Sequence, residues 1–250
     1  MKNSRKMTVL SQAAMAGASY AEKILAMAPI AFWRMNEASG TAAVCSVDSA
    51  QNGTYARDLS VMGTEDGPVT GEVAPTFDGS NDYLDLYTTT FREAFEAAVE
   101  ADGSISFWVK LPSAVWTDGT ARQFFLFRDD ANNWVSSARH TNNNYLRHQY
   151  RAGGTSETVD ASGQSDTGWV NWIFTWSVSS DEFKVYKNGV QIGTTQTGLG
   201  TWDGPVSALY TLIGASYKSP ISAPLSGSIS NFAVFDKVLS SGEIAVCTNP

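Results

Sequence analysis

The chain has 250 residues, 43% of them hydrophobic and 12% aromatic, so it can bury a sizeable core and is not a disordered sequence. Its net charge of −8 argues against nucleic acid as a partner, because neutralising a phosphate backbone requires clustered Lys and Arg. No stretch approaches the ~18 apolar residues of a membrane span, so a membrane is not an expected partner either.

The two cysteines and two histidines offer little chemistry. Cys45 and Cys247 are too few for a disulfide framework or a zinc site. Two interpretations remain open: two reduced thiols, or one bond joining the two ends of the chain. His140 and His148 lack a third metal ligand nearby in the sequence.

The N-terminal region is Ala-rich over residues 1–18 and has no stripe of core-facing residues. We expect it to pack against its own domain or a neighbouring subunit. Its basic start resembles a secretory signal, but polar residues interrupt the apolar run, so we expect no cleavage. Ser19 and Glu22 form a capping box, which predicts a helix over residues 20–27 with Ile24 and Leu25 facing inward. Residues 1–28 are thus an arm for docking or oligomer contacts, and residues 29–250 form one domain.

Short strands and turns follow along the chain, with turns roughly every 8–12 residues. A second capping box at Thr90 and Glu93 predicts a helix over residues 91–101, and a third at Ser240 and Glu243 predicts a final short helix. The predicted strands cover residues 30–35, 54–55, 83–86, 104–111, 123–128, 133–140, 144–151, 211–214 and 227–235.

The clearest strand pattern lies between residues 168 and 193. Side chains alternate over residues 169–176 with apolar groups on both faces, which indicates a central strand. Asn188 and Gly189 then supply the positive φ pair of a type I′ hairpin turn. The predicted fold class is all-β, a two-sheet antiparallel jelly-roll sandwich with short N-terminal, internal and C-terminal helices.

Seven motifs in order carry a family likeness, and together they resemble the laminin G-like, concanavalin A-like jelly-roll domain of pentraxins and lectins. The segment SYAEKILAMAPIAFWRMNEASG, residues 19–40, resembles laminin G-like domains carried by bacteriophage virion proteins. This resemblance implies a virion protein of the capsid surface, head fibre or tail. The seven motifs are AFWRMNEASG, DSAQNGTY, FDGSNDYLDL, SISFWVK, GWVNWIFTWS, VYKNGVQIG and GSISNFAVFDKVLSSGEI.

Carbohydrate binding on such a domain would use aromatic platforms and convergent polar groups. One face of a predicted strand carries alternate polar residues from 145 to 151; we expect it to be solvated and joined by an arginine of the preceding strand. The alternative is an ordinary solvated strand face. Tryptophans predicted in loops are either platforms or plugs that seal the sandwich. The candidate ligand-binding residues are Arg139, Tyr145, Arg147, Gln149, Arg151, Trp134 and Trp202.

Calcium is the one cofactor that the family resemblance implies. The loop from Asp48 to Asn52 would meet the last strand at Asn231, where the family often has an Asp. Asp78 and Asp82 form a second candidate, since hard oxygen ligands suit this ion. The alternative is that these side chains form Asx turns with their own backbone.

Catalysis is not expected. Glycoside hydrolysis needs two carboxylates at a fixed separation across a groove, and the glucanases of this fold carry them on one central strand. Glu93, Glu96 and Glu100 are spaced for a helix, and Asp82 and Asp85 would point to opposite faces. The sequence therefore predicts a non-enzymatic virion structural protein that displays a lectin-like domain for host-surface attachment. Its partners would be other virion proteins or copies of itself, and cell-surface glycan. The alternative is a carbohydrate-binding adhesion module of a bacterial or secreted, extracellular protein.

Overall fold

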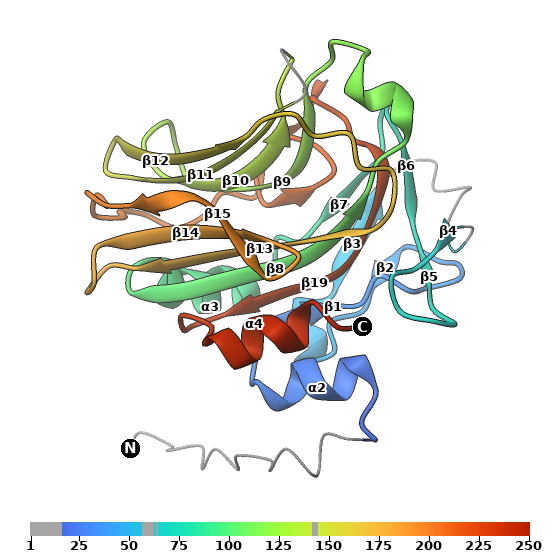
Figure 1. The fold of residues 1–250 in the computed structure, drawn as a ribbon, viewed down its shortest axis with the longest axis horizontal. Helices are drawn as coiled ribbons and strands as arrows, with labels where there is room; N and C mark the ends of the chain where they lie inside the picture. Colours follow the sequence, from blue (N-terminus) through green and yellow to red (C-terminus); the bar gives the residue numbers. More distant parts are fainter. Residues whose placement is uncertain (1–16, 57–62, 64, 142–144) are drawn as a thin grey trace.

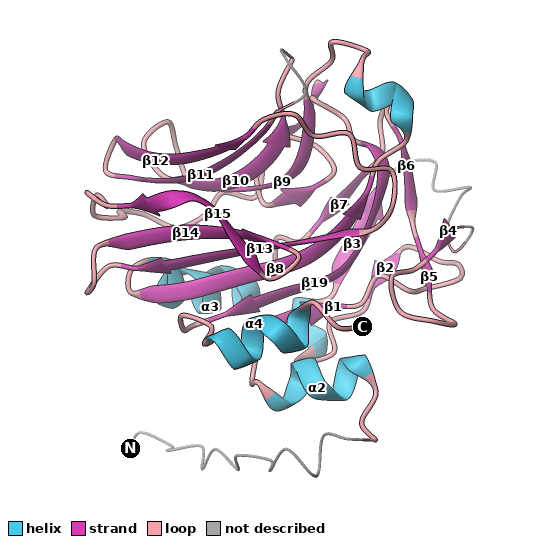
Figure 2. Cartoon of the chain, viewed as in Figure 1, coloured by secondary structure: helices cyan, strands magenta, loops and turns pink. Residues whose placement is uncertain are grey.

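The computed structural model describes residues 17–56, 63, 65–141 and 145–250. Two antiparallel sheets pack face to face, with helices against the first sheet and at the lower edge of the sandwich (Figure 1; Figure 2). The predicted all-β jelly-roll sandwich is confirmed. None of the helices in the described ranges is long and apolar enough to cross a membrane.

The first sheet contains the longest strands. Its spatial order is β1 (Ala31–Trp33), β19 (Ser226–Phe235), β8 (Asp102–Lys110), β13 (Val170–Ser177), β14 (Glu182–Lys187) and β15 (Val190–Gln196), and β6 (Thr76–Asp78) also pairs with β19.

The second sheet has the order β12 (Thr155–Ala161), β11 (Leu146–Ala152), β10 (Trp134–Arg139), β9 (Arg122–Arg128), β16 (Leu212–Ile213), β7 (Tyr83–Asp85), β3 (Gly53–Ala56) and β2 (Ala42–Ala43). Two small ribbons pair β4 (Glu65–Asp66) with β5 (Val73–Ala74), and β17 (Tyr217–Lys218) with β18 (Ile221–Ser222). The helices are α2 (Tyr20–Ala26), α3 (Thr89–Val99) and α4 (Ser241–Cys247), with 3₁₀ turns η1 (Ser49–Gln51) and η2 (Ser113–Trp116).

The central strand predicted over residues 169–176 is β13. It lies between β8 and β14, and every one of its residues is buried. Asn188 and Gly189 have φ of 48° and 80° and connect β14 to β15, where Lys187 pairs with Val190. The type I′ hairpin prediction is confirmed, because both turn residues occupy the left-handed region.

Aromatic rings fill the space between the sheets. Phe125 of the second sheet lies 5.4 Å from Phe107, 5.5 Å from Phe174 and 5.3 Å from Phe232, measured between ring centroids. Phe95 of α3 joins the same cluster. Close packing of large apolar side chains is the main stabilising term in such a sandwich.

The outer face of the first sheet is also buried. Ile173 of β13 points away from the inter-sheet core and packs with Phe32, Ile24 of α2 and Ile244 of α4. The two helices lie side by side against this face (Figure 1). They explain why β13 carries apolar residues on both faces.

Helix α2 is held to this body by polar contacts as well. Its capping box is present, as predicted: the Ser19 hydroxyl accepts from the Glu22 backbone N–H, and the Glu22 carboxylate accepts from Ser19. The Tyr20 hydroxyl donates to the Cys247 carbonyl at 2.9 Å and accepts from Trp108 Nε1 at 3.1 Å. The predicted inward position of Leu25 is wrong, since its side chain is 38% exposed. Only one narrow face of this short helix packs on the sandwich, and Leu25 lies outside that face.

The start of α3 corrects a second expectation. The N-cap is Thr88, whose Oγ1 accepts from the Phe91 backbone N–H at 3.0 Å, and not Thr90. The helix also ends earlier than predicted, because β8 already begins at Asp102. The predicted inward residues Phe91 and Phe95 are buried, so the helical face itself is confirmed.

Strand β12 was not predicted from the sequence. Its pattern, TSETVDA, has only Val159 and Ala161 buried, so it lacks the apolar alternation of its neighbours. The overlooked signal is the pair Gly153 and Gly154, which both have positive φ and connect β11 to β12. Of the predicted arm, residues 1–16 lie outside the described residues.

Both cysteines are buried, unbonded thiols. The backbone of Cys45 forms an isolated antiparallel β-bridge with Trp33, and Cys247 is the last residue of α4. The structure therefore agrees with two reduced thiols and not with a bond between Cys45 and Cys247. Burial raises the pKa of the Cys247 thiol to about 12, although a hydrogen bond with Ser106 acts in the opposite direction.

Candidate ligand-binding face

The outer face of the second sheet carries most of the predicted ligand-binding residues. In β11, Leu146, His148 and Tyr150 point into the core, whereas Arg147 and the alternate residues after it are partly exposed. The predicted alternation is therefore confirmed. Strand pairing sets this face beside the matching face of β10.

Three neighbouring strands bring two cations to one indole ring. Trp134 of β10 lies between Arg128 of β9 and Arg151 of β11 in the strand register. The Arg151 guanidinium is 4.6 Å and that of Arg128 is 5.8 Å from the Trp134 ring centroid. These are cation–π distances.

Two tyrosines extend this set of side chains beyond β9, one in the turn before β16 and one in β17. Arg128 also lies 4.6 Å from the ring centroid of Tyr210, which stacks on Tyr217 at 5.2 Å with 30° between the ring planes. All members are partly exposed. The aromatic–cation row, as we call it, consists of Arg151, Trp134, Arg128, Tyr210 and Tyr217.

The neighbouring polar residues are paired across strands. Arg147 makes two hydrogen bonds of 2.9 Å to the Asp160 carboxylate of β12, and its guanidinium lies 5.4 Å from the ring centroid of Tyr145. Gln149 Nε2 donates to the Thr158 hydroxyl at 3.1 Å. These contacts fix the side chains beside the aromatic–cation row. Sequence reasoning missed Arg128 and Tyr210, because neighbours on other strands and turns cannot be read from spacing within one strand.

The expectation for Arg139 is wrong. It pairs in register with Leu146, which points inward, so Arg139 belongs to the opposite face and is buried. Its Nη1 donates to the Thr120 carbonyl at 2.6 Å and to Asp118 at 3.2 Å, and its Nη2 donates to the Trp116 carbonyl at 3.3 Å. Arg139 therefore anchors the loop of residues 112–121 instead of facing solvent.

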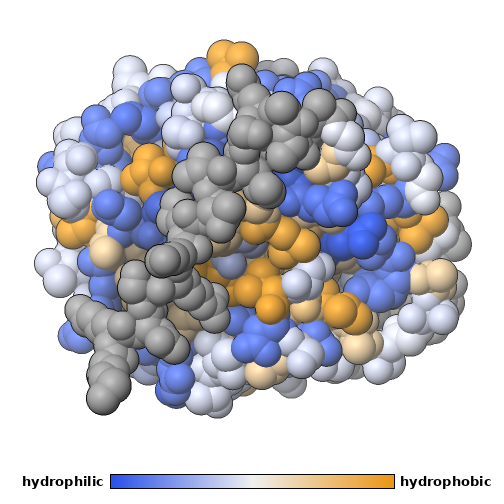
Figure 3. All heavy atoms as spheres, turned by 90° about the horizontal axis from the view of Figure 1, so that it is seen from below, coloured by the Kyte–Doolittle hydropathy of each residue, from blue (hydrophilic) through white to orange (hydrophobic). Residues whose placement is uncertain are grey.

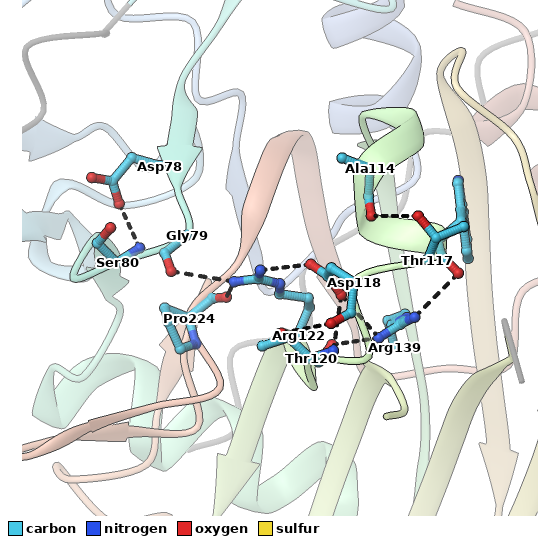
Figure 4. A network of polar contacts seen from close by, with 11 residues as sticks. Asp78, Gly79, Ser80, Ala114, Thr117, Asp118, Thr120, Arg122, Arg139 and Pro224 are labelled. Atoms are coloured by element: carbon cyan, nitrogen blue, oxygen red, sulfur yellow. Dashed lines mark hydrogen bonds and ion pairs between the residues drawn. The ribbon is translucent and has the colours of Figure 1, made fainter. Parts of the chain in front are cut away.

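Asp118 is the centre of this anchor (Figure 4). It accepts from Arg122 Nη2 at 2.8 Å in addition to Arg139. Partial burial raises the pKa of the Asp118 carboxyl, but hydrogen bonds from Arg122 and the Thr120 N–H outweigh it and hold that pKa below its usual range. The loop at this rim of the sandwich is thus fixed by charge-assisted hydrogen bonds.

Trp202 is not on the binding face either. It is buried against Phe95 and Tyr150, with ring centroids 6.3 and 6.4 Å away, and its Nε1 donates to the Gly204 carbonyl. Of the two open interpretations, the plug applies to Trp202. Trp134 differs, because it lies on a strand and remains partly exposed.

The residues predicted for calcium serve as turn formers. Asp48 Oδ1 accepts from the Ala50 N–H at 2.9 Å, and Asn52 Oδ1 accepts from the Cys45 N–H at 2.8 Å. Asn231 sits at an irregularity of β19 with φ of 53°, and its Nδ2 donates to Ser230 Oγ. The Asp48 contact is that of an Asx turn, whereas Asn52 and Asn231 bond a neighbouring backbone N–H and a serine hydroxyl.

The second calcium candidate is also bonded within its own loop. Asp78 Oδ1 accepts from the Ser80 N–H at 2.7 Å (Figure 4). Asp82 Oδ2 accepts from the Asp78 N–H at 3.0 Å. Across the described ranges, no group of three or more His, Cys, Asp or Glu could hold a metal ion. Calcium stays a prediction of the family resemblance.

The two histidines have separate surroundings. His148 is buried between the sheets, with Nδ1 3.0 Å from Ser137 Oγ and its ring 4.5 Å from that of Trp172. Burial lowers the pKa of His148 to about 3, so the ring is neutral at physiological pH. His140 stacks on Tyr145 at 4.9 Å beside the candidate face.

Two hollows lie elsewhere. A cleft of about 680 Å³ is bordered by Leu25, Pro29, Asp48 and Asp236, close to α2. A second, of about 260 Å³, lies beside the ion pair of Lys110 with Glu65. The aromatic–cation row is by contrast an open strand face, a shape suited to a ligand that lies across several strands.

The fold defines a lectin-like jelly roll, and comparison with known families agrees. The model of the concanavalin A-like lectin/glucanases superfamily, laminin G type, matches residues 78–245. The chain belongs to this superfamily. No curated protein sequence matches the chain.

Solved structures of lectin-like domains resemble the whole sandwich. The botulinum neurotoxin serotype D binding domain has a TM-score of 0.63 at 14% identity; the match covers 88% of this chain and 50% of that one. A structure of botulinum neurotoxin type C, whose cell entry is described as dependent on interaction with two ganglioside molecules, has a TM-score of 0.62 at 15% identity, with 89% of this chain and 51% of that one covered. The Ruminococcus gnavus sialidase module CBM40, bound to α2,3-sialyllactose, has a TM-score of 0.55 at 17% identity, with 70% and 96% covered. The chain spans about half the length of the neurotoxin domains.

Proposed function

We propose that this chain is a non-enzymatic, lectin-like domain that binds cell-surface glycan across the aromatic–cation row. The observation that carries the proposal is the partly exposed Trp134, flanked by hydrogen-bond donors from two adjacent strands. Sugar rings pack their C–H faces on aromatic side chains while polar neighbours bind their hydroxyls.

The structural neighbours support a glycan ligand, since one was solved with sialyllactose and another is described with gangliosides. Asp160 of β12 is paired with Arg147, and Asp85 of β7 is paired with Lys218 at 2.5 Å, so neither of these two carboxylates is placed as a free acid or base.

We place this domain on a virion surface, where it would attach the particle to its host. The support is the resemblance of residues 19–40 to phage virion proteins, together with the position of α2. Helix α2 packs on the first sheet, whereas the aromatic–cation row lies on the outer face of the second (Figure 1). A segment that docks the domain near α2 would leave the glycan-binding face pointing outward.

The surface around α2 and α4 offers apolar contacts for such docking. Seen from below, apolar residues gather near the centre of this side (Figure 3). Leu25 and Val238 are among the exposed large apolar residues. Apolar residues gathered on a surface are typical of an interaction site. The second candidate setting, an extracellular adhesion module, uses the same glycan-binding face without this docking.

The test of glycan binding is a screen of the full chain on a glycan array, followed by calorimetry. Trp134→Ala should lower the affinity for any bound sugar at least tenfold, because it removes the platform. Trp169→Ala is the matched control, since Trp169 is partly exposed, lies just before β13 of the first sheet, and donates to the Asp66 carbonyl. No binding at millimolar sugar, or equal losses in both variants, would contradict the proposal.

The docking role is tested separately by deleting residues 1–18. The shortened chain should fold with unchanged circular dichroism and lose incorporation into particles or oligomers. Normal incorporation would show that the assignment of roles is wrong and would favour the adhesion-module alternative.

A further inference from the structure

The arginines of the described ranges fall into two groups: those that form an ion pair with a carboxylate and those that do not. Arg128 and Arg151 have no ion pair among the described residues, and both belong to the aromatic–cation row. The arginines with a carboxylate within 4 Å are Arg34, Arg92, Arg122, Arg139 and Arg147. The chain has a net charge of −8, and within its described ranges the arginines without an ion pair are gathered at one ring.

Most donors of these two guanidinium groups remain available. A guanidinium has five N–H donors. Arg128 donates from Nε to the Asp130 carbonyl at 2.5 Å, and Arg151 donates from Nη1 to Ser156 Oγ at 3.1 Å. Both Nη groups of Arg128 and the Nη2 group of Arg151 therefore have no hydrogen-bond partner among the described residues.

The two cations approach one indole ring from the strands on either side of it. Arg128 and Arg151 lie on either side of Trp134 in adjacent strands, so their backbones are about 10 Å apart, given a strand spacing of ~4.8 Å. Long side chains from both strands converge on the indole between them. A carboxylate accepts paired N–H bonds from guanidinium groups and offsets their mutual repulsion, which a hydroxyl cannot do.

We infer that this face takes acidic oligosaccharides in preference to neutral ones, with a sugar carboxylate held by Arg128 and Arg151 beside Trp134. The inference rests on the proposed function, namely that the face binds glycan. The neighbouring Arg147 does not share this role, because Asp160 already accepts two of its hydrogen bonds.

The experiment compares each acidic sugar with its own methyl ester, which keeps the ring and removes the charge. Calorimetry of the full chain with an oligogalacturonate, with 3′-sialyllactose and with both methyl esters covers two sources of sugar carboxylate. The acid that binds should bind 10- to 100-fold more tightly than its ester. The double variant Arg128→Gln with Arg151→Gln should bring the acid down to the affinity of the ester, and Arg147→Gln should keep the preference.

The outcomes separate the inference from the proposed function. Equal affinity for acid and ester, both removed by Trp134→Ala, would overturn the inference and leave glycan binding intact. A preference for the acid that survives the double variant would overturn the assignment to these two arginines. Binding of neither acid nor ester, nor of any array glycan, would overturn the proposed function itself.

Discussion

The hydroxyl of Tyr20 is the most direct test of how the N-terminal helix is held. Tyr20→Phe removes one oxygen that accepts from Trp108 Nε1 and donates to the Cys247 carbonyl. Tyr20 and Trp108 are both buried, so the indole N–H loses its partner without access to water. An unsatisfied buried polar group costs about 1–3 kcal/mol, and we expect the free energy of unfolding to fall by about 2–3 kcal/mol.

Urea denaturation followed by tryptophan fluorescence measures this loss. A loss of this size should also lower the Tm by roughly 4–12 °C, given about 2–4 °C per kcal/mol for a chain of this length. The matched control is Tyr186→Phe, because Tyr186 packs against the same cluster and is only partly buried. If Tyr20→Phe unfolds within about 0.5 kcal/mol of the wild type, as expected of an ordinary surface change, the helix is not held by this hydroxyl.

Three further predictions concern the core. Burial lowers the pKa of His148 to about 3, so the ring is neutral in the folded chain. The unfolded chain binds more protons below pH 6.5, and the free energy of unfolding therefore falls as the pH decreases from 6.5 toward 3, by at most about 1.4 kcal/mol per pH unit. Urea denaturation at several pH values should show a smaller decrease in His148→Phe than in the wild type; the same decrease in both would refute the prediction. Arg139→Leu should lower the free energy of unfolding by about 1–3 kcal/mol and expose the loop of residues 112–121 to protease, because it leaves the Thr120 and Trp116 carbonyls without this donor; an uncleaved, equally stable variant would contradict this. Gly103→Ala should lower the free energy of unfolding by about 1–3 kcal/mol, because its Cβ would lie 2.1 Å from the Trp176 ring. The control Gly168→Ala adds a Cβ in open space, so thermal melting should give it the Tm of the wild type and Gly103→Ala a lower one.

The fold could be predicted from the sequence wherever local patterns decide it. The alternation of β13, the Asn188–Gly189 turn and the capping boxes at Ser19 and Ser240 rest on interactions within a few residues. Strand β12 could not be predicted in this way. It is a polar edge strand whose conformation depends on pairing with β11, and its own residues carry little apolar pattern.

The candidate site was only partly predictable for the same reason. The face of Arg147, Gln149 and Arg151 follows from period two within one strand. Whether Arg139 joins that face depends on the register between β10 and β11, since a shift of one residue reverses every side chain. The contact of Arg128 with Trp134 depends on the register between β9 and β10, and its contact with Tyr210 joins residues far apart in the sequence, so no pattern within one strand contains them.

The central claim, that glycan binds across the aromatic–cation row, is tested most directly by NMR of the indole N–H signals during titration with a sugar selected on the array. The chain has 8 tryptophans, and substitution assigns the signals of Trp134 and Trp169. The account predicts that the Trp134 signal shifts with the binding curve while that of Trp169 stays in place. A bound sugar that leaves the Trp134 signal unmoved would contradict it.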